Sequence, residues 1–131
     1  MILPDTSAWI EYFRATGSRA HLRLRATIMS RDVVATTEPV MMELLAGARD
    51  VAQADALRRA LARSTLLPVR DLDTWFDAAD LYQSGRRRGV TVRSHVDCLI
   101  AAVAIREEVP VLHHDRDFVT LSRFSPLQLV S

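Results

Sequence analysis

Short apolar runs that alternate with longer stretches of helical period constrain the fold of this chain more than any other feature. Apolar runs of this length suit buried strands, and their alternation with helices is typical of an α/β domain built on a mainly parallel sheet. We therefore expect an α/β fold with a short sheet of four or five strands. The expected strands cover residues 2–4, 33–35, 66–69, 109–113 and 127–130.

Helices should form the larger part of the chain. Thr37 is placed to cap one helix, whose first turn tolerates Pro39, while Ser94 can cap the most apolar helix and Pro110 stops it. Pro4 has no N–H to donate, so it should lie at a strand end or where pairing is one-sided. The expected helices cover residues 7–14, 18–29, 38–48, 51–64, 72–85 and 95–108, with another turn or two near residues 117–122.

Size and composition narrow the possible functions. A chain of 131 residues, with no internal repeat and no linker, suits one domain spanning 1–131. The net charge of +1 gives no global attraction to nucleic acid or to an anionic membrane. All 17 basic residues are Arg, and the absence of Lys excludes a Walker A loop and Schiff-base chemistry. Any polyanionic partner must therefore be bound locally.

The chain shows no sign of export or membrane insertion. Its first residues lack a basic segment and a long apolar stretch, so no signal peptide is expected. The longest apolar run, residues 98–105, is far shorter than the roughly 20 residues that span a bilayer. The single Cys98 has no partner for a disulfide and is expected in the core. We expect a cytoplasmic protein with no membrane partner.

Carboxylates stand at positions where burial is expected. Asp5 ends the first strand, at the carboxyl edge of the sheet where open α/β folds bind ligands, although it could serve only as a helix cap. Asp97 directly precedes the long apolar run, so it is either held by a cation or serves the helix dipole. Asp115 and Asp117 follow the strand at 109–113 and reach the same edge, but such pairs are also common in turns.

Glu43 is less clearly placed than the aspartates. It lies off the centre of the apolar face of its helix, and by periodicity it could simply be solvated. The start of a helix that follows a parallel strand nevertheless lies at the carboxyl edge of the sheet. Glu43 could therefore reach the other acids.

Convergence of these five acids would require a cation. Two carboxylates about 5 Å apart repel by roughly 3 kcal/mol at an effective dielectric near 20. Hard oxygen ligands select Mg²⁺ or Mn²⁺, which bind through a few carboxylates together with substrate phosphates. Such sites polarise a phosphoryl oxygen and activate water. The pattern therefore favours hydrolysis of a phosphodiester or another phosphate.

Four segments together make the chain resemble PIN-domain ribonucleases, and more closely the VapC-type toxins of bacterial VapBC toxin–antitoxin pairs. The segments are Asp-Thr-Ser-Ala-Trp at 5–9, Glu-Pro-Val-Met-Met-Glu-Leu-Leu-Ala-Gly at 38–47, Asp97 with its apolar run, and Val-Leu-His-His-Asp-Arg-Asp-Phe at 111–118. The resemblance implies a three-layer α/β/α fold and endonucleolytic cleavage of RNA with Mg²⁺ or Mn²⁺. It also implies a homodimer and a small VapB-type antitoxin that neutralises a growth-inhibiting toxin.

The resemblance also implies roles for individual residues. The acidic quartet would be Asp5, Glu43, Asp97 and Asp115, with Asp117 as a further acid beside it. Asp5 and Asp97 are expected as direct metal ligands, while the other acids would bind a second ion, hold water or act indirectly. Thr6 or Ser7 would brace Asp5. The chain departs from the family pattern at His113, where Thr is common, and at Pro4, where an aliphatic residue is more usual. For His113 and His114 we favour a structural or surface role over metal ligation.

Arginines near Asp97 are candidates for binding RNA. Their guanidinium groups suit bidentate contacts with phosphates on either side of the cut, although a solvated helix end would explain them equally. The candidates are Arg86, Arg87, Arg88 and Arg93.

Two other functions remain open at this stage. A PIN-like module that binds RNA or protein without cutting would have little reason to retain five acids. An aspartate-dependent phosphatase with Asp5 as nucleophile would lack both its usual second Asp, since Ser7 stands there, and its Lys. The RNA target cannot be read from the motifs, because RNA recognition depends on shape and exposed loops.

Overall fold

A parallel sheet lies at the centre of the computed structural model, which describes residues 1–131. The ladders pair β1 with β4 and β2 with β3, and single bridges at Ile2–Val34 and Val111–Leu129 join these ladders to each other and to the C-terminal segment. The resulting order is β3-β2-β1-β4, with Leu129 at the far edge, and the predicted α/β class is confirmed. The strands are β1 (Leu3–Pro4), β2 (Ala35–Thr36), β3 (Thr65–Leu66) and β4 (Val111–Leu112).

The strands are shorter than the sequence predicts, and local hydrogen bonding explains part of the difference. Pro4 has no N–H for the β2 side, so β1 and β2 are joined by one bridge, as the one-sided pairing predicts. Pairing of β3 with β2 ends at the hydrogen bond from the Leu67 N–H to the Thr36 carbonyl (2.7 Å), because the next N–H on that side, that of Val69, donates to Glu38 Oε1 (2.9 Å). The predicted strand at 127–130 is reduced to a single bridge, between Leu129 and Val111.

All predicted helices are present, with ends within two residues of the prediction. The expected cap by Thr37 is wrong: its side chain accepts no capping hydrogen bond, since Pro39 removes one of the two N–H groups that such a cap would use. Ser94 does cap α6, accepting from the Asp97 N–H. The helices are α1 (Thr6–Phe13), α2 (Arg19–Met29), α3 (Glu38–Ala46), α4 (Val51–Ala62), α5 (Leu72–Arg87), α6 (His95–Glu107) and α7 (Arg116–Ser122).

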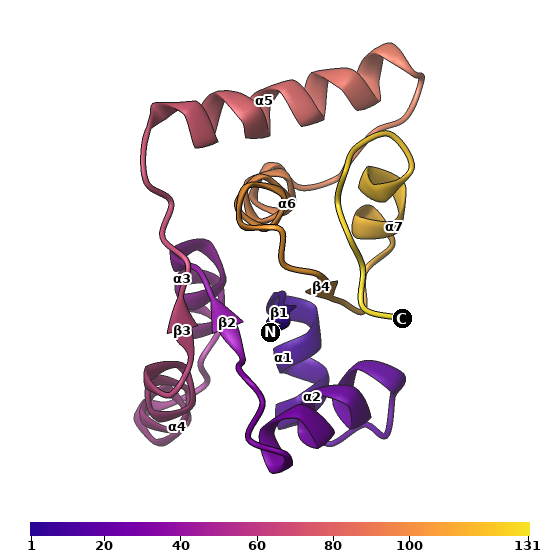
Figure 1. The fold of residues 1–131 in the computed structure, drawn as a ribbon. Coiled ribbons are helices and arrows are strands. Elements are labelled where there is room, and N and C mark those ends of the chain that lie inside the picture. Colours follow the sequence, from indigo (N-terminus) through magenta and orange to yellow (C-terminus); the bar gives the residue numbers. More distant parts are fainter.

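The helices cover both faces of the sheet. Figure 1 shows α5, α6 and α7 on one side of the strands and α1 and α2 on the other, with α3 and α4 beside β2 and β3. None of the seven helices combines the length and the apolar composition that a membrane span requires. The expected three-layer arrangement is therefore present.

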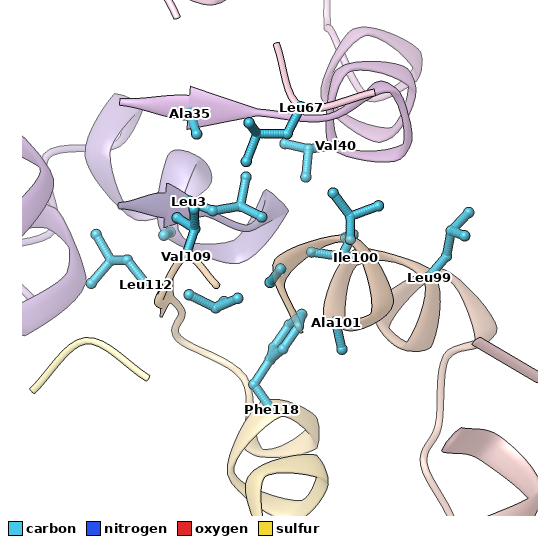
Figure 2. Packing of buried hydrophobic residues seen from close by; sticks show 14 of the residues in the cluster. Leu3, Ala35, Val40, Leu67, Leu99, Ile100, Ala101, Val109, Leu112 and Phe118 are labelled. Atoms are coloured by element: carbon cyan, nitrogen blue, oxygen red, sulfur yellow. The ribbon is translucent and has the colours of Figure 1, made fainter. Parts of the chain in front are cut away.

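Helix α6 forms the centre of the core. Eight consecutive residues from Asp97 to Ala104 are buried, as expected for a helix that is apolar on nearly all sides. Figure 2 shows Ile100 of α6 among side chains of the strands, including Leu3, and Phe118 of α7 near Ala101. This packing fixes the first turn of α6, and with it Asp97, against the carboxyl edge of the sheet.

Candidate active site

Three aspartates meet at the carboxyl edge of the sheet. Asp115 directly precedes α7 and caps it by accepting from the Asp117 N–H (2.9 Å), and Asp97 lies in the first turn of α6. One carboxylate oxygen from each of Asp97, Asp115 and Asp117 lies within 4.8 Å of the others. The fold thus gathers residues from α6 and α7 into one group, which we call the three-carboxylate group.

Burial and mutual repulsion disfavour the charged form of Asp97. Removal from water is the largest cause, followed by the charges of Asp115 and Asp5, and together with a hydrogen bond to Asp117 they raise the pKa of Asp97 to about 8. A cation that neutralised the neighbouring acids would restore the charged form. The site therefore has the electrostatics of a cation-binding site.

Asp5 lies beside this group. Its carboxylate accepts from the Ser7 hydroxyl (2.7 and 2.9 Å) and from the Ala8 N–H (2.9 Å), so it also caps α1. Burial outweighs these hydrogen bonds and, with the charge of Asp115, raises the pKa of Asp5 to about 6. The capping role and the proximity to the acids, which the sequence left as alternatives, occur together.

The Glu43 carboxylate is held by Thr6, one of the two residues expected to brace Asp5. The Thr6 hydroxyl donates to Glu43 Oε1 (2.6 Å), whereas Ser7 alone braces Asp5. Thr6, the residue that follows Asp5, therefore links α1 to α3 and holds the Glu43 carboxylate at the start of α1. Glu43 lies outside the three-carboxylate group and lines a pocket with apolar side chains of α1 and α3, among them Ile10 and Leu44.

Arg93 differs most from its predicted position. Rather than flanking the site, its guanidinium pairs with Asp115 (Nη2 to Oδ1, 2.9 Å) and with Asp117 (Nε to Oδ1, 3.3 Å). These carboxylates raise the pKa of Arg93 further. The sequence offered no signal for this contact beyond the position of Arg93 just before the cap of α6.

The other candidate arginines lie at the end of α5. Arg86, Arg87 and Arg88 are exposed, and the Arg88 guanidinium lies over the Phe124 ring, 5.5 Å from its centroid. Arg88 is therefore partly engaged within the protein, while no ion pair holds Arg86 or Arg87.

The two histidines have neighbours that explain them structurally. His113 Nδ1 accepts from the Asp115 N–H (3.3 Å), and burial lowers the pKa of His113, which keeps the ring neutral. His114 Nε2 lies 3.4 Å from Glu11 Oε1, and the His114 N–H donates to the Ser7 hydroxyl. Both observations agree with the structural role favoured from the sequence.

The sequence matches the PIN domain family over residues 2–123. The chain belongs to the PIN-domain family. Within it, the chain is 45% identical over 132 aligned residues to the ribonuclease VapC11 of Mycobacterium tuberculosis, covering 100% of this chain and 98% of the relative. A VapC ribonuclease of Mycobacterium bovis matches with the same identity and coverage. The predicted resemblance to VapC-type proteins is confirmed.

Solved structures agree with this PIN-domain fold. The VapBC2 complex of Rickettsia felis, bound to a promoter DNA fragment, contains a chain that superposes with a TM-score of 0.77 at 18% identity, covering 99% of this chain and 98% of that one. The VapBC-5 complex of M. tuberculosis gives a TM-score of 0.62 at 32% identity, covering 74% and 80%. The PIN chain thus shares the fold of proteins solved as toxin–antitoxin complexes.

The donor set of this PIN domain fits a hard divalent cation. The candidate ligand atoms of Asp97, Asp115 and Asp117 are all carboxylate oxygens, and the neighbouring His113 is neutral, with its Nδ1 accepting a hydrogen bond. Mg²⁺ and Mn²⁺ prefer such ligands and bind through few of them. Asp97, Asp115 and Asp117 are the residues whose positions suit direct ligation, with Asp5 next to them.

Proposed function

We propose that this PIN-domain protein is a metal-dependent endoribonuclease that acts as a VapC-type toxin. The observation that carries the proposal is the three-carboxylate group at the carboxyl edge of the sheet, in a chain that is 45% identical to ribonucleases over its full length. Residues 1–131 would form one domain with one such site. The catalytic set would be Asp5, Glu43, Asp97, Asp115 and Asp117.

A bound divalent metal ion would supply the positive charge that the carboxylate side chains of the site lack. Mg²⁺ or Mn²⁺, when bound, stabilises negative charge on the phosphodiester and promotes attack by water. The metal ion would be held by Asp97, Asp115 and Asp117. Asp97 would lose its proton when the metal ion binds. Ser7 keeps the Asp5 carboxylate oriented, and Thr6 does the same for Glu43, so that both acids face the reaction from α1 and α3.

RNA would approach along the end of α5. Arg86 and Arg87 are exposed and free of ion pairs, which suits contacts with phosphates on either side of the cut. Arg88 would contribute less, because it already stacks on Phe124. These contacts are with the phosphate backbone of the RNA, so they would increase affinity without selecting a base sequence.

The relatives also suggest the partners. The similar structures are described as VapBC toxin–antitoxin complexes, so we propose a VapB-type antitoxin that neutralises this chain. The homodimer implied by the resemblance to VapC-type toxins remains part of the proposal. The pocket lined by Ile10, Leu44 and Glu43 is the candidate place for an antitoxin segment, because it joins an apolar surface to an acid of the site.

Cleavage of a mixed cellular RNA pool tests the activity. Purified protein with Mn²⁺ or Mg²⁺ is expected to yield discrete fragments, which EDTA and Asp97→Asn should both abolish. Asp73→Asn is the matched control, because Asp73 lies in the first turn of α5 as Asp97 does in α6, but is exposed and outside the site. Intact RNA under every condition would favour a binding module, and fragments that persist in EDTA would contradict metal dependence.

A further inference from the structure

We propose that Arg93 is an internal cation that competes with the divalent ion for the carboxylates of Asp115 and Asp117. The inference rests on the proposed metal site and goes beyond it, since it assigns a regulatory role to a residue that is not a ligand. Arg93 is the one cation that forms ion pairs with the three-carboxylate group.

Arg93 engages both oxygens of Asp117. Its Nε donates to Oδ1 (3.3 Å) and its backbone N–H donates to Oδ2 (3.2 Å). Asp117 is buried, so these hydrogen bonds replace water that the carboxylate has lost. A metal ion bound at Oδ1 of Asp117 would compete with the Arg93 guanidinium for that oxygen.

The second pair involves Asp115. Arg93 Nη2 lies 2.9 Å from Asp115 Oδ1, which also accepts from the Asp117 N–H. The guanidinium thus spans two of the three carboxylates with a planar fork that a Lys could not reproduce. It neutralises part of the negative charge that would otherwise attract a divalent ion.

The side chain of Arg93 is free to leave. It is 64% exposed and is not part of the hydrophobic core, so moving it away from the acids would expose no core residue. The backbone N–H would stay with Asp117 and keep the carboxylate in place. Two states follow: a metal-free state with Arg93 on the acids, and a metal-bound state in which the freed guanidinium faces solvent at the site where RNA phosphates would lie.

Calorimetric titration with Mn²⁺ at low ionic strength tests this competition. Arg93→Gln is expected to bind Mn²⁺ about 5-fold more tightly than the wild-type protein, because it removes two partly exposed ion pairs. Arg93→Lys should fall between them. Arg116→Gln is the matched control: Arg116 lies between the two aspartates in sequence and is exposed, but pairs with neither, so its loss should change affinity less than about 2-fold.

A measurement on the wild-type protein avoids dependence on the folding of a variant. The Arg93 Nε–H should exchange slowly with solvent in EDTA and faster once Mg²⁺ is added, as observed by NMR. Unchanged exchange, or Mn²⁺ affinity in Arg93→Gln that equals or falls below that of the wild type, would overturn the competition and leave the metal site intact. Absence of Mn²⁺ binding by both the wild-type protein and Arg93→Gln would instead overturn the proposed metal site, and this inference with it.

Discussion

At the scale of single residues, burial determines how the acids behave. Asp97 is buried at the start of the most apolar helix, beside other carboxylates, and its pKa rises to about 8, while that of Asp5 rises to about 6. Both groups bind a proton in the folded protein at pH values where the unfolded chain has lost it. Folding stability without metal therefore falls as pH rises, from about pH 4 through pH 8.

Replacing Asp97 should remove the part of this pH dependence that lies at higher pH, near the pKa of Asp97. In EDTA, we expect the melting temperature of the wild-type protein to fall between pH 5 and pH 8, and that of Asp97→Asn to be nearly constant above about pH 7, where Asp5 has lost its proton. At pH 8 the variant should be more stable than the wild type. Thermal unfolding followed by circular dichroism at several pH values checks this, with Asp73→Asn as control. A variant no more stable than the wild type at pH 8 would contradict the raised pKa of Asp97.

At the scale of elements, helix ends were predictable and strand lengths were less so. Capping residues and prolines act on their immediate neighbours, and the ends of helices such as α6 therefore lie within two residues of the prediction. Strand pairing depends on which N–H groups meet across the sheet. Pro4 limits the pairing of β1 with β2, and the Val69 N–H donates to the Glu38 side chain rather than to β2, in ways that apolar runs do not reveal.

Gly85 is a position in helix α5 where contacts with neighbouring residues outweigh local helix propensity. Alanine normally stabilises a helix interior by about 1 kcal/mol relative to glycine. A Cβ at Gly85 would lie 3.2 Å from the Val90 carbonyl oxygen and 3.3 Å from the Phe124 ring.

Gly85→Ala is therefore expected to destabilise the protein, because overpacking costs about 1–3 kcal/mol and exceeds the gain in helix propensity. Urea unfolding measures the change. Ser84→Ala, the preceding position in α5, is the control and should be close to neutral. An increase in stability for Gly85→Ala would mean that the turn after α5 adjusts freely.

At the scale of the whole molecule, α6 ties the site to the core. Its buried residues contact strands on one side and α7 on another, where Phe118 is fully buried (Figure 2). Asp115 and Asp117 belong to the same α7 segment as Phe118. Packing of this aromatic side chain therefore helps to keep two acids beside Asp97.

Phe118→Ala is expected to cost about 3–5 kcal/mol, a large share of the stability of a domain of this size. Phe76→Ala is the matched control, since it makes the same chemical change at a side chain that is 59% exposed. Urea denaturation should show a much lower midpoint for Phe118→Ala and little change for Phe76→Ala. Equal midpoints for the two variants would argue against the central position of Phe118.

The α/β class, the order of helices and strands, the family and the candidate acids could all be predicted from the amino-acid sequence. These depend on local periodicity, on capping and on residue types at fixed positions. The pairs of side chains that meet could be identified from the folded structure alone. Thr6 pairs with Glu43 across 37 positions, and Arg93 reaches Asp115 across 22 and covers the acids it was expected to flank. Such contacts depend on distances of a few ångströms between elements far apart in the chain, which no local pattern encodes.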